Sequence, residues 1–255
     1  MSSAGGIQVR TVMPIADRVA NLNRWRRKSL VEKATLALGM LALALLLPPF
    51  PAAPVIAAVM TGAALIGARV PAGIWLALAA GPLGFMLTGA AMLTVQIDAT
   101  GLSLAPSGFY VAAGLIARST AGLSCLLFLA LTTPVTDLLA GMRRLGLPAE
   151  VTEVALLTYR FLFLLADTAM AMDAAQAARL GHDGFKRRLH SLGLLAANLL
   201  PRAMDRARRM EIGLAARGWE GEMRVLRQQS KLSAFGLTAV LAVEAATAAI
   251  GVFLS

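Results

Sequence analysis

The sequence predicts an all-α, polytopic membrane protein with about five transmembrane helices and a cytoplasmic helical domain. Three observations support this prediction. Hydrophobic residues make up 58% of the 255 residues, whereas soluble domains contain about 45–50%. They lie in long blocks almost free of charge. Most of the 24 lysine and arginine residues lie in stretches that flank those blocks, as expected when basic loops remain in the cytoplasm.

The N-terminal segment is strongly basic. Residues 1–33 hold seven lysine and arginine side chains, opposed only by Asp17 and Glu32. No small-residue cleavage site follows the first apolar block, so we expect no signal peptide and a first span that is retained. The positive charge predicts a cytoplasmic N-terminus.

Five apolar segments approach the length of about 20 residues that a span needs. The predicted spans are 30–47, 55–68, 74–93, 109–133 and 232–254. The second segment is short, so it either crosses a thinned bilayer or packs inside the protein. The segment 96–108 is polar and rich in Gly, Ser and Pro, which predicts a loop.

The placement of basic residues predicts three segments along the chain. Residues 1–133 hold the N-terminal segment and four spans, residues 134–231 form the cytoplasmic domain, and residues 232–255 form the last span. Segment 151–166 is a competing sixth span, but a sixth span would place part of the basic region outside. We therefore expect a buried helix there.

Arg118 and Glu244 are charged residues that lie within predicted spans. Charges within a membrane are costly and are often functional. Either these two side chains pair with each other, or Arg118 extends to the outer surface.

Glycine and proline divide the cytoplasmic domain into helices. We expect helices at 135–145, 149–180, 185–200 and 201–217. Gly146 and Pro148 end one helix and start the next. Pro201 either begins a new helix or kinks one.

Two of these helix ends repeat one pattern of small alanines, one arginine and a glycine that suits a helix C-cap. The first is Ala178-Arg179-Leu180-Gly181 and the second is Ala216-Arg217-Gly218. In each helix the arginine ends an apolar stripe with helical spacing. Such an arginine can reach into a partner's groove, where its planar fork suits a carboxylate or backbone carbonyls. The alternative is that it complements the helix dipole while its stem covers apolar surface.

The motifs between residues 137 and 221 together resemble the T components of energy-coupling-factor (ECF) transporters, and most closely the CbiQ-type subunits of cobalt and nickel importers. They comprise Asp137-Leu138-Leu139, the segments 142–148, 157–161, 175–181 and 189–195, and Ala216-Arg217-Gly218-Trp219-Glu220-Gly221. The second arginine motif is intact. The first has Leu180 between Arg179 and Gly181, the variant that the resemblance associates with the cobalt/nickel branch.

The resemblance implies a non-catalytic subunit of an ABC transporter in the bacterial inner membrane. The two arginine motifs would dock on two cytoplasmic ATPase subunits. Further membrane partners would be a substrate-capture (S) subunit and a small accessory subunit. The cargo of the complex would be Co²⁺, with Ni²⁺ second. The first alternative is an ECF vitamin importer.

Two other classes are less well supported. A membrane-embedded enzyme would need a polar constellation in the spans, which offer only Arg118, Cys125 and Glu244. A stand-alone transporter often carries an inverted repeat, and we detect none. We expect no cofactor or metal, because the chain lacks a Walker-type phosphate loop and the spacing of Cys125, His182 and His190 does not suit a metal site. Aromatic residues make up only 5%, which disfavours nucleic-acid binding.

Overall fold

The computed structural model describes residues 15–98, 101–104, 108–218 and 233–253. The chain divides into two compact units. We call residues 15–138 and 228–255 the core unit, and residues 139–227 with 1–14 the arm unit. The predicted division into residues 1–133, 134–231 and 232–255, with the middle segment cytoplasmic, stays a prediction.

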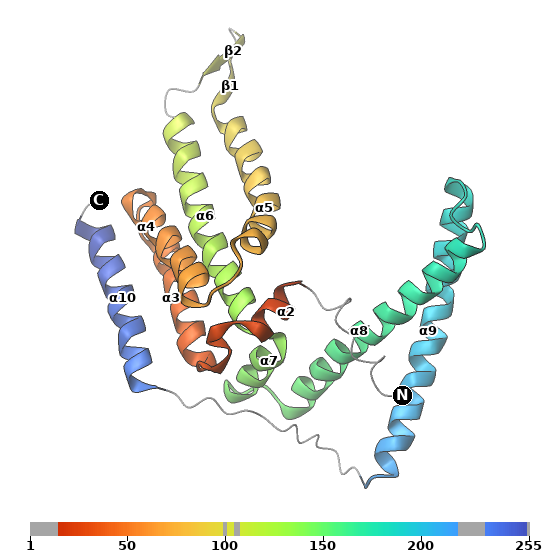
Figure 1. The fold of residues 1–255 in the computed structure, drawn as a ribbon. Coiled ribbons are helices and arrows are strands. Elements are labelled where there is room, and N and C mark those ends of the chain that lie inside the picture. The colour runs from red at the N-terminus through yellow and green to blue at the C-terminus, as the bar shows by residue number, and fades with distance from the viewer. Residues whose placement is uncertain (1–14, 99–100, 105–107, 219–232, 254–255) are drawn as a thin grey trace. The chain divides into compact units, whose positions relative to one another are not determined.

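The core unit is a bundle built around one central helix. Its elements are α2 (Ile15–Leu22), η1 (Arg24–Arg27), α3 (Leu30–Leu46), α4 (Pro49–Gly62), the π-helical turn η2 (Ala63–Gly67), α5 (Ala72–Leu93), β1 (Val95–Asp98), β2 (Gly101–Leu104), α6 (Gly108–Thr132), the start of α7 (Val135–Arg144) and α10 (Ala234–Phe253). Helix α6 packs against α3, α4 and α5, and α10 packs against α3 and α4 (Figure 1).

The centre of the core unit is closely packed. Met40, Ile56, Met60 and Phe128 are fully buried. Buried alanines on α3, α4 and α6 allow the backbones of these helices to approach closely. They are Ala37, Ala44, Ala52, Ala53 and Ala121. The outer faces of α5 and α10 instead expose large apolar side chains such as Phe85 and Phe235, as expected of faces that contact lipid.

Five helices of the described residues are long and apolar enough to cross a membrane. They are Pro49–Gly67, Ala72–Leu93, Gly108–Thr132, Ala149–Ala178 and Ala234–Phe253. The number agrees with the prediction, but the set differs. Helix α3 has only 17 residues, about 25 Å against a hydrocarbon core of about 30 Å. Helix α8 (Ala149–Ala178), which was not among the predicted spans, is long and apolar enough to cross.

Two predictions about the connections between spans were wrong. The second apolar helix begins before Pro54, at Pro49, so it is not confined to 55–68. Ala52, Ala53, Ile56 and Met60 on one face of it are buried, and with η2 it is long enough to span. The expected loop at 96–108 contains the antiparallel strands β1 and β2, in the register Val95↔Leu104 and Asp98↔Gly101. The alternation of apolar and polar residues in both strands was the signal for this hairpin.

The arm unit consists mainly of two long helices, α8 and α9 (Phe185–Ala215), joined by a short turn (Figure 1). The expected buried helix at 151–166 is wrong, because Thr152 is the only buried residue of α8. The expected boundary at Pro201 is also wrong, because α9 continues through this residue as one helix of 31 residues. The predicted stop after α7 is confirmed by Gly146, which has a φ of +102°.

Candidate functional site

The first arginine motif forms the end of α8 and the turn that follows it. Arg179 is the C-cap residue, and Leu180 adopts the left-handed conformation with a φ of +60°. The Gly181 N–H donates to the Gln176 carbonyl at 2.9 Å, and the Leu180 N–H donates to the Ala177 carbonyl at 3.0 Å. This pair of bonds defines a Schellman motif. The left-handed position therefore belongs to Leu180, and our assignment of Gly181 as the capping glycine was wrong.

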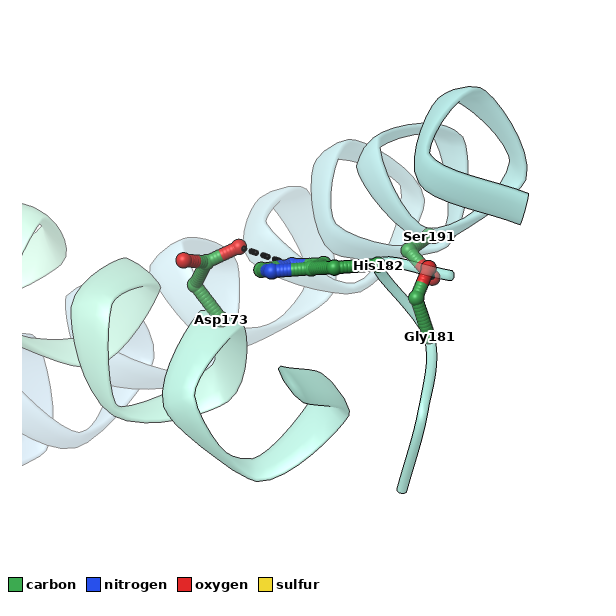
Figure 2. A network of polar contacts seen from close by, with 4 residues as sticks. All are labelled: Asp173, Gly181, His182 and Ser191. Atoms are coloured by element: carbon green, nitrogen blue, oxygen red, sulfur yellow. Dashed lines mark hydrogen bonds and ion pairs between the residues drawn. The ribbon is translucent and has the colours of Figure 1, made fainter. Parts of the chain in front are cut away.

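Gly181 is required for a different reason. A Cβ atom on this residue would lie 2.7 Å from Ser191 Oγ and 2.9 Å from the Gln176 carbonyl oxygen. The Ser191 hydroxyl, on α9, donates to the Gly181 carbonyl at 3.0 Å (Figure 2). Ser191 is only 7% exposed. The close approach at Gly181 thus lets a buried side chain fix the turn against the next helix.

A second contact fixes the turn to the preceding helix. His182 Nε2 lies 3.0 Å from Asp173 Oδ1, on the last part of α8 (Figure 2). Arg187 pairs with Asp183 at 3.1 Å, one helical turn apart. The backbone that carries Arg179 and Leu180 is therefore held on both sides. The Arg179 side chain is exposed, and Leu180 is 70% exposed.

The second arginine motif ends α9 in a related but not identical way. The Arg217 N–H donates to the Leu214 carbonyl at 3.0 Å, and the Gly218 N–H donates to the Ala215 carbonyl at 3.1 Å. Gly218 has a φ of +68°, so here a glycine does occupy the left-handed position. Ala216 and Arg217 are exposed. The rest of this motif, from Trp219, lies outside the described residues.

The apolar stripes that lead to the two arginines are partly covered. On α9 the least exposed residues recur every three, four or seven positions and lead to Arg217. They are Ser191, Leu195, Leu199, Ala203, Met210 and Leu214. On α8 the stripe is half-buried up to Met172 and exposed from Ala175 onward. Because α9 has 31 residues, about 45 Å separates its two ends.

The two intramembrane charges do not pair with each other. Arg118 Nη2 donates to the Leu47 carbonyl at 2.7 Å, whereas Glu244 Oε1 is buried with no hydrogen-bond partner among the described residues. Leu47 is the C-cap of α3. Helix C-termini leave carbonyls without partners and favour a nearby cation. Arg118 therefore caps α3.

Sequence reasoning missed a set of polar residues that cap helix ends in the core unit. Lys33 Nζ donates to the Thr132 carbonyl at 2.9 Å, at the C-terminus of α6. Glu32 Oε1 accepts a bond of 2.9 Å from the Ser233 N–H, immediately before α10. Each charge suits the helix dipole that it faces. The sequence signal for these contacts is that both charged residues lie inside the first turn of the apolar helix α3. We interpreted them only as charges that flank the first span.

No group of three or more His, Cys, Asp or Glu side chains within the described residues could hold a metal ion. Cys125 is buried in α6. His182 contacts Asp173. The expectation that this chain holds no metal or cofactor stays a prediction.

Comparison with known proteins identifies the family. The family model described as "CbiQ: Cobalt transport protein" matches residues 22–229. The chain is 52% identical to the cobalt transport protein CbiQ of Rhodobacter capsulatus, over 93% of this chain and 98% of that protein. It is 30% identical to the CbiQ protein of Salmonella typhimurium, over 81% of this chain and 97% of that one.

A third relative is a fused protein, and this chain matches only part of its length. A protein of Methanocorpusculum labreanum, named as a putative fused cobalt transport protein CbiMQ, is 29% identical over 75% of this chain and 34% of its own length. The family match covers most of the chain, including both arginine-bearing helix ends, and the apolar helices fit a multi-pass membrane protein. The chain therefore belongs to the CbiQ family of cobalt transport proteins.

Proposed function

We propose that this chain is the membrane coupling subunit of an ECF-type ABC importer for Co²⁺, with Ni²⁺ as the second candidate cargo. The observation that carries the proposal is the pair of exposed arginines, Arg179 and Arg217, at the ends of one long helical arm. ATP hydrolysis and metal capture then belong to other subunits. The names of the relatives support the cobalt cargo.

Each arginine motif docks in a groove on one of two cytoplasmic ATPase subunits. Arg179 stands beside the exposed Leu180, so this end offers both charge and apolar surface. The guanidinium group suits a carboxylate or backbone carbonyls of the partner. A spacing of about 45 Å along α9 favours two separate docking sites over one shared site.

The core unit holds the membrane partners. These are a substrate-capture subunit and a small accessory membrane subunit, and the fused CbiMQ relative favours a CbiM-type protein as the neighbour. The complex lies in the bacterial inner membrane, with the N-terminus and residues 134–231 in the cytoplasm. The basic residues that flank the apolar blocks support this orientation.

The direct test is to co-express the tagged chain with the products of its neighbouring genes, identify the subunits that co-purify, and measure Co²⁺ and Ni²⁺ uptake in cells. The expected result is co-purification of two ATPase subunits and a membrane partner, with uptake that needs all components. Co-purification with a vitamin-binding subunit would support the vitamin importer. Uptake without any ATPase would contradict the proposal.

A further inference from the structure

The core unit contains a cavity of about 420 Å³ between α2 and the start of α5. One wall comes from the end of α2 and the residue after it, and the other from the connection into α5. The lining residues are Arg18, Val19, Leu22 and Asn23 on the first wall, and Arg69, Pro71 and Ile74 on the second.

Contacts next to the cavity hold its two walls together. The Arg24 N–H donates to the Ala68 carbonyl at 3.3 Å. The ring of Trp25 packs against Gly67, where an added Cβ would lie 3.1 Å from the ring. These contacts fix the backbone of the two walls, while the side chains of Arg18, Leu22 and Arg69 that line the cavity are exposed.

The position of the cavity in the chain places it at a membrane surface. Residues 68–71 connect two helices that are long and apolar enough to span, Pro49–Gly67 and Ala72–Leu93. A connection between consecutive spans lies where the hydrocarbon core ends, because its backbone needs water or polar partners. The cavity is consequently at the level of the lipid head groups.

The side chains of the cavity combine two cations with an apolar wall. Within the described residues, neither Arg18 nor Arg69 has an ion-pair or hydrogen-bond partner for its side chain. A guanidinium group binds phosphate oxygens in a bidentate manner. Leu22 and Ile74 provide apolar surface for the glycerol backbone and the first methylene groups of a lipid.

Arg69 adopts a backbone conformation that costs energy for any residue except glycine. Its φ is +56°, in the left-handed region that long side chains rarely occupy. Strained residues of this kind gather at ligand-binding positions. A glycine would fit the turn without strain, so the arginine side chain itself is the feature that needs an explanation.

We propose that this cavity binds the head group of an anionic phospholipid, with Arg18 and Arg69 on its phosphate. Basic pockets beside membrane helices recognise such head groups by the same chemistry. The proposal does not depend on the coupling function, because it rests only on residues of the core unit.

The test uses the purified full-length chain in detergent and counts bound lipid by native mass spectrometry after titration with phosphatidylglycerol or phosphatidylethanolamine. We expect wild type to retain phosphatidylglycerol preferentially. Arg18→Gln and Arg69→Gly should each weaken this retention at least about tenfold, because each removes a charge-assisted contact. Arg27→Gln is the matched control: Arg27 is exposed in η1 and does not line the cavity.

Arg69→Gly also separates lipid binding from folding, because glycine accepts the positive φ. We expect this variant, stripped of lipid, to unfold at a temperature no lower than that of wild type. Retention of phosphatidylglycerol by both cavity variants, or equal retention of the two lipids by wild type, would overturn the proposal. So would displacement of the lipid by an equal concentration of inorganic phosphate, because the cavity would then be a site for the free anion.

Discussion

The Lys33 ammonium group, at a residue only 1% exposed, donates a 2.9 Å hydrogen bond to the carbonyl of Thr132. The two residues are 99 positions apart in the chain. The bond joins the first turn of α3 to the last turn of α6. Two residues further along the chain, at Pro134, α6 gives way to α7, within which the arm unit begins at Leu139.

Lys33→Met should destabilise the protein by about 1–3 kcal/mol, because it leaves the Thr132 carbonyl buried without its donor. The change keeps the length and apolar volume of the side chain. Thermal unfolding of the purified protein in detergent would measure the effect, with Lys186→Met on the exposed start of α9 as the control. An unchanged unfolding temperature would mean that the cost of burying the charge equals the value of the cap.

Gly181→Ala should destabilise the arm unit by about 1–3 kcal/mol, in the range typical of overpacking. The added Cβ would meet Ser191 Oγ at 2.7 Å and the Gln176 carbonyl at 2.9 Å. Gly193→Ala is the matched control, since nothing lies within 4 Å of its Cβ position and alanine favours the helix. Protection of the α8–α9 turn in hydrogen exchange is the appropriate measurement. Equal protection in both variants would contradict the tight approach at Gly181.

Leu180→Gly should have the opposite effect on the stability of the same turn. Leucine at a φ of +60° carries a strain of about 1–2 kcal/mol, and the flexibility of glycine in the unfolded chain offsets about 0.5–1 kcal/mol of the gain. We expect a net stabilisation between about 0 and 1.5 kcal/mol, read from the same hydrogen-exchange experiment. Loss of ATPase binding in this otherwise stable variant would show that the Leu180 side chain itself contacts the partner.

Arg179→Glu and Arg217→Glu should each weaken association with the ATPase subunits more than tenfold, because a charge-assisted contact contributes about 1.5–3 kcal/mol. The double variant should lose association more completely, since the two residues lie on different turns. Co-purification of the ATPase subunits and metal uptake at equal expression would measure both effects. Arg208→Glu, exposed on α9, is the control. Full assembly and uptake in both motif variants would show that the arginines only end their helices and do not contact the ATPase subunits.

The path of α8 across or along the membrane can be decided by reporter fusions. If residues 134–231 are cytoplasmic, alkaline phosphatase fused after Gly146 and after Gly181 should be inactive in both cases, because that enzyme is active only in the periplasm. If α8 crosses the membrane, as its length and composition permit, the two fusions should differ in activity. That result would overturn the charge-based topology on which the cytoplasmic arm depends.

The sequence predicted the elements whose limits are set by local chemistry. Gly146 and Pro148 separate α7 from α8, and Pro48 follows the end of α3, because glycine and proline act within one turn of the backbone. The sequence did not predict the capping contacts. The place of Glu32 and Lys33 in the first turn of α3 marks them as unusual, but their partners Ser233 and Thr132 lie 201 and 99 positions away, so no local pattern specifies the contacts.

The same limit applies to the candidate site. The two arginine motifs could be found from their repeated composition, and both lie at helix ends. The sequence could not show that Leu180 takes the left-handed position and that Gly181 instead allows a close contact. The contact at Gly181 depends on the approach of Ser191 from the next helix.

The position of Pro201 gives α9 a mechanical property. This residue lies near the middle of Phe185–Ala215, and proline removes one hydrogen bond of the helical ladder there. A rod weakened at its centre bends at that point before it bends elsewhere. A tilt of about 10° at the centre displaces either end of a helix of about 45 Å by roughly 4 Å. The Ser191–Gly181 hydrogen bond ties the turn that carries Arg179 to the first part of α9, and Arg217 directly follows the last turn of this helix. A bend at Pro201 therefore changes the distance between the two arginines.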